Sequence, residues 1–338
     1  MSYNRSHKLT IYLIDPVHNY TRASSTWMIP LNVMYMKSYL ERLFPNQLNV
    51  SCFKFADDLF AAMGNHTPDI VGTSNYIWNN ELAKLITRHA KQADPNIMTI
   101  MGGPNITENA SSMTALLANA QADFHIIDSG EHPFAMLVKC RLEGKDLQQT
   151  FEDDQVHSVW FLSSITNTAL CKNKKECLKD INIIPSPILY GHADVFFADG
   201  LLPMLETNRG CPFSCAYCVW GKGMKTQHFA IDRVKEELTY CSQKAPGGLL
   251  MINDANFGLY SRDFEIAKHI KQLNQKYNWP ESVVVNWGQA HSDSALAIAD
   301  LLQGICLFRQ SSQSMNPDVL QAIGRKNITD KQWSKVKN

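Results

Sequence analysis

The sequence lacks several features that would place it in a large class of proteins. No apolar run approaches the ~20 residues needed to cross a bilayer, so we expect no membrane span. The formal net charge is zero and no basic stripe is visible, so nucleic-acid binding has no electrostatic support. Residues 1–8 lack the pattern of a signal peptide.

A disulfide framework is also missing. The nine cysteines are an odd number in a chain of 338 residues, which favours a reducing, cytoplasmic setting. The two CxxC-type pairs that structural zinc loops usually show are absent as well. We interpret six cysteines as packing residues or free thiols: Cys52, Cys140, Cys171, Cys177, Cys241 and Cys306.

The other three cysteines stand close together at a CxxxCxxC spacing, as Cys211, Cys215 and Cys218. They follow a short apolar strand expected over 201–205. Three thiolates on one loop can hold three corners of an iron–sulfur cube, and since four cysteines are usual, one iron would stay open. An open metal position can take a substrate, as in catalytic zinc sites. A zinc site without its fourth ligand and chance clustering are the alternatives.

The N-terminal half alternates five times between expected strands and helices. This pattern predicts a doubly wound α/β domain with a parallel sheet. The expected strands cover 9–15, 48–53, 69–74, 97–101 and 123–128. The expected helices cover 30–44, 57–63, 80–93, 107–119 and a last segment that ends near 142.

Polar and glycine-rich segments fall where these strands end, at 15–20, 74–79, 102–107 and 129–132. Ligands of such sheets bind beyond the carboxyl ends of the strands, and glycine allows a backbone to approach a ligand closely. The alternative is that these segments are only short turns, because the fold alone names no ligand.

Residues 146–200 are less regular and are interpreted as an interdomain connection with a possible hairpin at 158–162 and 169–171. Four βα units are expected after it. Their strands cover 201–205, 248–253, 282–286 and 305–310, and their helices cover 231–244, 262–277, 293–302 and 317–323. Asp254 follows the second of these strands, at the end where barrel active sites lie.

The cysteine motif, with Tyr217 directly before its third cysteine, resembles that of the radical S-adenosylmethionine (radical SAM) superfamily. The N-terminal half resembles the cobalamin-binding domain that precedes the radical SAM domain in one branch. The cobalamin motif DxHxxG is not found, and in that branch it is commonly missing. The resemblance implies a flavodoxin-like cobalamin-binding domain over 1–145, a linker over 146–200 and a partial TIM-type radical SAM barrel over 201–338.

The resemblance also implies three sets of site residues. The 4Fe–4S cluster would be held by Cys211, Cys215 and Cys218. S-adenosylmethionine would contact Tyr217, Trp220, Gly221, Asp254, Asn256, Asn286 and Gln313. Cobalamin would contact Asp15, Ser74, Asn75, Gly102, Gly103, Pro104, Gly130 and Glu131. Arg209 would position the cysteine loop, or would be a solvated charge at a strand end.

The implied activity is reductive cleavage of S-adenosylmethionine to a 5′-deoxyadenosyl radical, followed by cobalamin-dependent methylation of an unactivated carbon. The implied partners are a small-molecule or peptide substrate and an electron donor such as flavodoxin or ferredoxin. Another radical SAM reaction, such as cyclisation or rearrangement, is the alternative, and so is a non-catalytic cofactor-binding fragment. Because the family normally continues with more βα units, we expect this chain to be C-terminally truncated.

Overall fold

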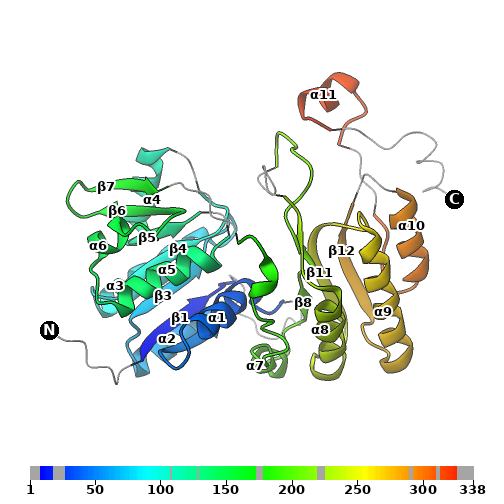
Figure 1. Ribbon diagram of the computed structural model, residues 1–338, viewed down its shortest axis with the longest axis horizontal. Coiled ribbons are helices and arrows are strands. Elements are labelled where there is room, and N and C mark those ends of the chain that lie inside the picture. Colours follow the sequence, from blue (N-terminus) through cyan, green and yellow to red (C-terminus); the bar gives the residue numbers. More distant parts are fainter. Residues whose placement is uncertain are drawn as a thin grey trace. The chain divides into compact units, whose positions relative to one another are not determined.

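The computed structural model describes residues 8–17, 27–106, 109–127, 129–172, 178–218, 225–288, 292–309 and 313–325 (Figure 1). The chain divides into two compact units, each with its own sheet. The first unit comprises residues 1–23, 30–179 and 183–187. The second comprises residues 24–29, 180–182 and 188–338.

The first unit contains a seven-stranded sheet in the order β2-β1-β3-β4-β5-β6-β7. Five strands are parallel: β1 (Leu9–Ile14), β2 (Leu48–Phe53), β3 (Ile70–Ser74), β4 (Met98–Gly102) and β5 (Phe124–Ile126). The prediction of an α/β unit with a parallel sheet is therefore confirmed. The order changes direction between β1 and β3, the switch point where such sheets bind ligands.

The remaining two strands come from the segment that we expected to connect the domains. β6 (Val159–Ser163) pairs antiparallel with β5, and β7 (Thr168–Lys172) pairs antiparallel with β6. Trp160 and Phe161 are buried on opposite faces of β6, and the burial of their apolar rings stabilises the hairpin as an extension of the sheet. Residues 146–172 thus belong to the first unit.

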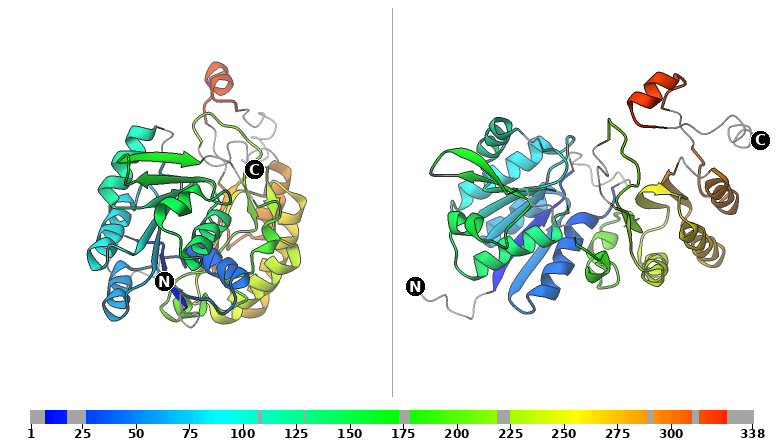
Figure 2. Two further views of the ribbon diagram at one scale, coloured as in Figure 1. Left: turned by 60° about the vertical axis from the view of Figure 1, so that its left-hand side comes forward. Right: turned by 45° about the horizontal axis from the view of Figure 1, so that its top comes forward.

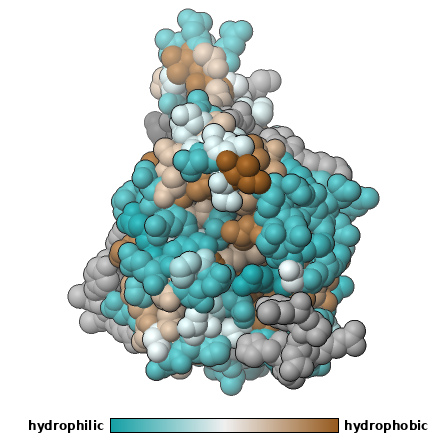
Figure 3. All heavy atoms as spheres, turned by 90° about the vertical axis from the view of Figure 1, so that its left-hand side faces the viewer, coloured by the Kyte–Doolittle hydropathy of each residue, from teal (hydrophilic) through white to brown (hydrophobic). Residues whose placement is uncertain are grey.

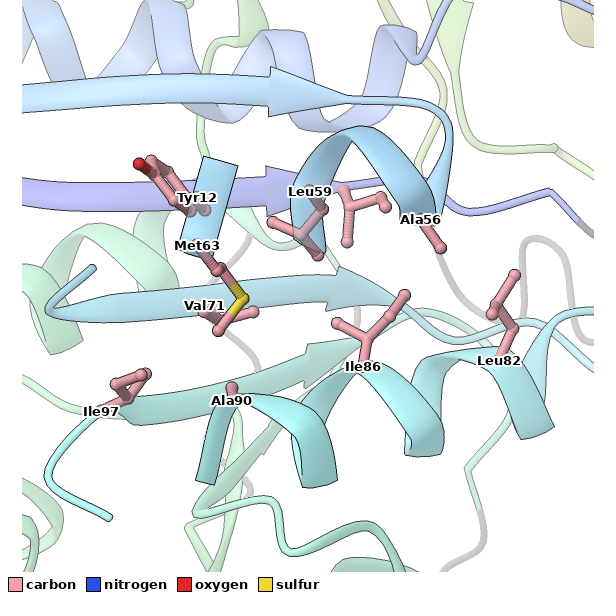
Figure 4. Packing of buried hydrophobic residues seen from close by; sticks show 10 residues of the cluster. Tyr12, Ala56, Leu59, Met63, Val71, Leu82, Ile86, Ala90 and Ile97 are labelled. Atoms are coloured by element: carbon pink, nitrogen blue, oxygen red, sulfur yellow. The ribbon is translucent and has the colours of Figure 1, made fainter. Parts of the chain in front are cut away.

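Helices cover both faces of this sheet. The helices α1 (Leu31–Leu43) and α5 (Glu131–Leu142) pack against each other. The helices α2 (Ala56–Asn65), α3 (Asn80–Ala93) and α4 (Ala110–Ala120) cover the other face, and α6 (Leu147–Glu152) follows α5. Figure 4 shows Leu59 and Met63 of α2 and Ile86 of α3 packed over Tyr12 and Val71 of the sheet. Apolar burial of this kind is the main stabilising contribution to the unit.

The second unit is built on a three-stranded parallel sheet in the order β12-β11-β8. Its strands are β8 (Met204–Leu205), β11 (Leu249–Phe257) and β12 (Ser282–Trp287). Its long helices α8 (Ile231–Lys244), α9 (Ser261–Tyr277) and α10 (Ser292–Leu301) pack side by side (Figure 2). Its short elements are α7 (Asp194–Ala198), β9 (Asn208–Arg209), β10 (Gln227–His228) and α11 (Pro317–Ala322), and η1 (Ile181–Ile183) has residues in both units.

The fourth strand of this unit, which we expected over 305–310, does not form in the described residues. Within 305–309, the structure forms a single parallel bridge, between Cys306 and Val283. Leu307 is 65% exposed, so the segment gains little apolar burial that would hold it flat against β12. The described residues of the second unit therefore form a parallel sheet of three strands, and this sheet does not close into a barrel.

The surface is ordinary for a folded domain. Most residues visible in Figure 3 are hydrophilic, and hydrophobic residues form smaller groups between them. Among the described residues, no helix has both the length and the apolar character needed to cross a membrane.

Candidate functional site

The cysteine motif occupies a loop of the second unit, directly after β9. Cys215 is 6% exposed, and Cys211 and Cys218 are half-buried. The backbone N–H of Cys218 donates to the carbonyl oxygen of Cys215 (3.0 Å), which closes a tight turn between these two cysteines. Gly210 has φ +93°, a left-handed conformation that glycine adopts without strain, and it turns the chain from β9 into the loop.

Two sulfur atoms of the loop accept hydrogen bonds from distant parts of the unit. The Asn256 amide Nδ2, on β11, donates to Cys211 Sγ (3.1 Å). The Arg325 guanidinium Nη1, just after α11, donates to Cys215 Sγ (3.3 Å). Cys215 also interacts with the hydroxyl group of Tyr217. These contacts tie the cysteine loop to β11 and to the segment after α11.

The sulfur atoms of the loop do not have the spacing that a single metal ion requires. Tetrahedral zinc with Zn–S bonds of about 2.3 Å requires sulfur atoms about 4 Å apart. In the part of the chain that the structure describes, only Cys140, Glu143 and Asp153 bring three ligand atoms within 4.8 Å of one another, and the three loop cysteines do not. An iron–sulfur cluster differs in this respect, because each thiol would bind its own iron.

The side chain of Lys145 contacts the two carboxylates of the group formed by Cys140, Glu143 and Asp153. Its ammonium Nζ lies 2.7 Å from Glu143 Oε2 and 2.5 Å from Asp153 Oδ2. The side chain of Lys145 therefore already supplies the positive charge that a metal ion would bring. Lys145, Glu143 and Asp153 form a salt-bridge cluster beside the buried thiol of Cys140.

Asp254 fixes the chain that leads into the cysteine loop. It is fully buried on β11, and its carboxylate accepts hydrogen bonds from Thr207 N (2.7 Å), Asn208 N (3.2 Å) and Asn208 Nδ2 (2.7 Å), as well as from the Thr207 hydroxyl. Burial raises the pKa of Asp254 to about 7, although these hydrogen bonds act to lower it. The side chain implied to contact S-adenosylmethionine is thus engaged with the Thr207–Asn208 backbone.

Two arginines stabilise the same segment, Arg262 from α9 and Arg209 from within the segment itself. Arg262 donates to the carbonyl oxygens of Thr207 (2.9 Å) and Phe229 (2.6 Å). Arg209 forms an ion pair with Glu206 (2.7 Å) and lies over the Phe229 ring. The sequence analysis did not single out Arg262, because nothing in a helix pattern marks a side chain that reaches back to a loop. Arg209 is partnered within its own segment.

The other residues implied for S-adenosylmethionine are distributed as follows. Tyr217 is 54% exposed next to the cysteines, and Gln313 is exposed. Asn286 Nδ2 donates to the backbone oxygen of Asp254 (3.2 Å) and so lies near the entry to the loop. Trp220 and Gly221 lie outside the described residues. The structure brings Asn256 and Tyr217 to the cysteine sulfur atoms.

Asp15 lies at the carboxyl end of β1 in the first unit and joins three elements. Its carboxylate accepts hydrogen bonds from Lys54 Nζ (2.6 Å), Ser74 Oγ (2.6 Å) and Asn32 Nδ2 (3.2 Å). Burial by itself would raise the pKa of Asp15, but the charge of Lys54 and these hydrogen bonds outweigh it and lower the pKa. The predicted residues Asp15 and Ser74 therefore meet, and Lys54 is the partner that the sequence analysis missed.

A second polar cluster surrounds Asn75, which is fully buried. Its N–H donates to the carbonyl oxygen of Gly102 (2.6 Å), and its Nδ2 lies 3.2 Å from the Asn105 oxygen and 3.3 Å from His125 Nε2. His125 Nδ1 lies 2.9 Å from the Ile126 carbonyl oxygen, which can only accept. His125 is thus neutral, with its proton on Nδ1 and with Nε2 accepting from Asn75. Burial lowers the pKa of His125 to about 4.

Glycines shape the loops next to this cluster. Gly103 has φ +127°, and a Cβ atom there would lie 2.6 Å from the backbone oxygen of Asn75. A Cβ atom on Gly130 would lie 2.6 Å from Met36 Cε. Pro104 is exposed beside the half-buried Gly102, and Glu131 is buried in the first turn of α5. The predicted loops therefore include a position, Gly103, that only glycine fits.

The loop after β3 also presents exposed apolar side chains. Ile77 is 82% exposed and Trp78 is 65% exposed, and the rings of Tyr76 and Trp78 stack with centroids 4.6 Å apart. The sequence analysis predicted this loop as a ligand loop from its position but did not single out these residues. Apolar and aromatic side chains beside a few polar groups are typical of ligand-binding sites.

The comparison with protein families identifies the class of the first unit. Residues 21–138 match the family model of the B12 binding domain. This range contains the ends of β3 and β4, where Ser74, Asn75 and Gly102–Pro104 lie. The chain therefore carries a B12-binding domain.

Relatives extend the similarity to the second unit. Over most of its length, the chain is homologous to cobalamin-dependent radical SAM methyltransferases. It is 30% identical over 322 residues to the cobalamin-dependent radical SAM methyltransferase TokK of Streptomyces tokunonensis. This alignment covers 89% of this chain and 45% of the relative. It is 30% identical over 290 residues to the 2-(S-pantetheinyl)-carbapenam-3-carboxylate methyltransferase of Streptantibioticus cattleyicolor. This second alignment covers 81% of this chain and 40% of the relative.

The chain spans less than half the length of these two curated relatives. Among solved structures, a cobalamin-binding protein from Desulfitobacterium hafniense aligns with a TM-score of 0.30 at 12% identity. That alignment covers 40% of this chain and 58% of the other.

Proposed function

We propose that this chain binds the cofactors of a radical SAM reaction in which an unactivated carbon is methylated with the help of cobalamin. The observation that carries the proposal is the cysteine loop: Cys211, Cys215 and Cys218 share one loop, and two of their sulfur atoms accept N–H donors. The B12-binding domain before it supports the cobalamin part of the proposal. A four-iron cluster on three cysteines keeps one iron for S-adenosylmethionine.

Each part of the chain has a defined task in this proposal. Cys211, Cys215 and Cys218 bind the cluster, and Asp254 and Arg262 hold the segment that leads to them. When bound, the cofactors supply an electron, an adenosyl radical and a methyl group. In the first unit, Asp15, Ser74, Asn75 and Gly103 shape the loops that would bind cobalamin. The resemblance further suggests a flavodoxin or ferredoxin as electron donor and a small molecule or peptide as substrate.

Anaerobic reconstitution tests the proposal. The protein is incubated with iron, sulfide and hydroxocobalamin, desalted, and analysed for iron, sulfide and cobalt and by ultraviolet–visible spectroscopy. We expect about four irons per chain with the brown absorption of a 4Fe–4S cluster. On reduction with added S-adenosylmethionine, we expect 5′-deoxyadenosine in the product mixture.

The control variants separate the cluster from other thiols. Cys215→Ala is expected to lose most of the iron and all 5′-deoxyadenosine, because a three-cysteine site has no spare ligand. Cys241→Ala, which removes a buried cysteine of α8 in the same unit, is expected to keep both. A colourless protein that binds zinc, or equal iron content in the two variants, would contradict the proposal.

The methylation step has a readout of its own. If 5′-deoxyadenosine forms but cobalt does not bind, the chain is a radical SAM protein with another reaction, such as cyclisation or rearrangement. If cobalt binds and the product gains the mass of one methyl group, the methyltransferase assignment holds. Because the relatives are longer, the substrate assay should also be carried out with any additional C-terminal region of the protein present.

A further inference from the structure

We propose that Arg325 is a positioning residue for the iron–sulfur cluster: its guanidinium binds Cys215 Sγ and raises the reduction potential of the cluster held there. This inference rests on the proposed function, because it concerns a cluster bound by Cys211, Cys215 and Cys218. It goes further in assigning a role to a residue that lies 110 positions beyond its cysteine partner.

The segment that carries Arg325 is attached to the cysteine loop at several points. Arg325 Nη1 donates to Cys215 Sγ (3.3 Å), and the guanidinium lies 5.4 Å from the centre of the Phe213 ring. The backbone N–H of Ala216 donates to the carbonyl oxygen of Ile323 (3.1 Å). Both backbone and side chain therefore hold residues 323–325 against the loop.

The conformation of Gly324 completes this attachment. It has φ +66°, and a Cβ atom there would lie 3.6 Å from the Ser214 carbonyl oxygen. The left-handed turn follows α11 directly and reverses the chain so that Arg325 points back to the cysteines. The position of Arg325 is thus set by the end of the helix and does not depend on a long flexible segment.

The charge of Arg325 determines the direction of the effect. Reduction adds one negative charge to the cluster, and a nearby positive charge stabilises the reduced form more than the oxidised form. Cys211 receives its hydrogen bond from Asn256, which is neutral. Arg325 therefore contributes charge as well as a donor, whereas Asn256 contributes a donor alone.

The experiment is an anaerobic redox titration of the reconstituted cluster, followed by electron paramagnetic resonance without S-adenosylmethionine. The variants are Arg325→Met, Arg325→Gln and Arg325→Lys. Lys268→Met serves as the control, since it removes a half-exposed positive charge on α9. Circular dichroism and iron content are measured first for every variant.

We expect Arg325→Met to make reduction at least tenfold less favourable, which for a one-electron couple is a fall of about 59 mV in midpoint potential. Arg325→Gln should show most of this fall, because it keeps a donor but no charge. Arg325→Lys should restore most of the potential, and Lys268→Met should leave it unchanged. Loss of iron in Arg325→Met together with retention in Arg325→Lys would support the same role.

Three results would overturn the inference: equal midpoint potentials in wild type and Arg325→Met, an equal fall in Arg325→Met and Lys268→Met, or loss of iron from Arg325→Met and Arg325→Lys alike. Failure of the proposed function looks different. In that case the wild-type protein itself holds no cluster after reconstitution, and no potential can be measured for any variant.

Discussion

Each unit has an aspartate of low exposure where a strand meets the site, and the two units balance its charge in opposite ways. Asp15 at the end of β1 pairs with the ammonium group of Lys54, and its pKa is lowered. Asp254 on β11 accepts hydrogen bonds from the uncharged groups of Thr207 and Asn208, and its pKa is raised to about 7. A buried carboxylate therefore keeps its charge when a cation shares its burial, and tends to take up a proton when only neutral donors do.

This difference bears on how each site can work. In the first unit the charges are balanced within the protein, so its loops present glycines and apolar groups such as Trp78 to a ligand. In the second unit Asp254 helps to fix the chain before the cysteine loop, and the sulfur atoms receive their own donors. The cysteine thiols are thus the groups that the second unit makes available for binding.

The largest effect is expected from removal of the cation in the first unit. Lys54→Met leaves the mostly buried Asp15 carboxylate, whose side chain is 15% exposed, without a cation, which should lower the free energy of unfolding of this unit by up to about 3–5 kcal/mol. Lys37→Met is the control, because its pair with Glu41 is partly exposed and 3.8 Å long and should contribute less than about 1 kcal/mol. Hydrogen exchange of the β1 and β3 amides measures both, and equal effects would contradict the role given to Lys54.

The pH dependence of Asp254 should come next. Its folded pKa of about 7 exceeds the ordinary value of 3.8, so its contribution to stability is fully present below pH about 4 and is lost as the pH rises through 7. The total change is about 4 kcal/mol by the conversion of 1.36 kcal/mol per pKa unit. Hydrogen exchange of the Thr207–Arg209 amides in wild type and Asp254→Asn should show this slope in the wild type alone.

His125 should show the opposite slope in the first unit. Its folded pKa of about 4 lies below the ordinary 6.5, so its contribution is fully present above pH 6.5 and is lost as the pH falls to about 4. The expected change is about 3 kcal/mol. Urea denaturation of wild type and His125→Gln between pH 7.5 and pH 4.5 gives the difference, and parallel pH profiles would show that His125 does not titrate as described.

The smallest effect is expected at the glycine of the β4 loop. Gly103→Ala forces a side chain into a left-handed backbone position and against the Asn75 oxygen, at a cost of about 1–3 kcal/mol. The control is Gly64→Ala in α2, where a Cβ atom meets nothing within 4 Å and should stabilise the helix by about 0.5–1 kcal/mol. Thermal unfolding compares the two, and weaker cobalamin binding by Gly103→Ala alone would assign this loop to the ligand site.

Much of the secondary structure followed from local patterns. The expected strand over 48–53 and the expected helices over 80–93 and 231–244 agree with β2, α3 and α8 to the residue. Such elements are determined by apolar periodicity and by signals at their ends, and both depend on residues that are close together in the sequence. The strand over 305–310 was wrong, because a strand also needs a neighbour and burial, and these are not local properties.

The candidate sites also combine features that local sequence determines with contacts that it does not determine. The spacing of Cys211, Cys215 and Cys218 is a local property, and so is the position of the glycine-rich segments at strand ends. Their partners come from far along the chain: Lys54 for Asp15, His125 for Asn75 and Arg325 for Cys215. No pattern in the sequence marks these pairs, because packing alone brings them within hydrogen-bond distance.

The amino-acid order was enough to specify three thiols on one loop, an alternating α/β first unit and the residues at its strand ends, because each depends on neighbours a few positions away. Only the tertiary structure decided which carboxylate keeps its charge and which sulfur faces a cation. Those outcomes depend on burial and on the distance between charges, and both are set by contacts between segments that the sequence holds far apart.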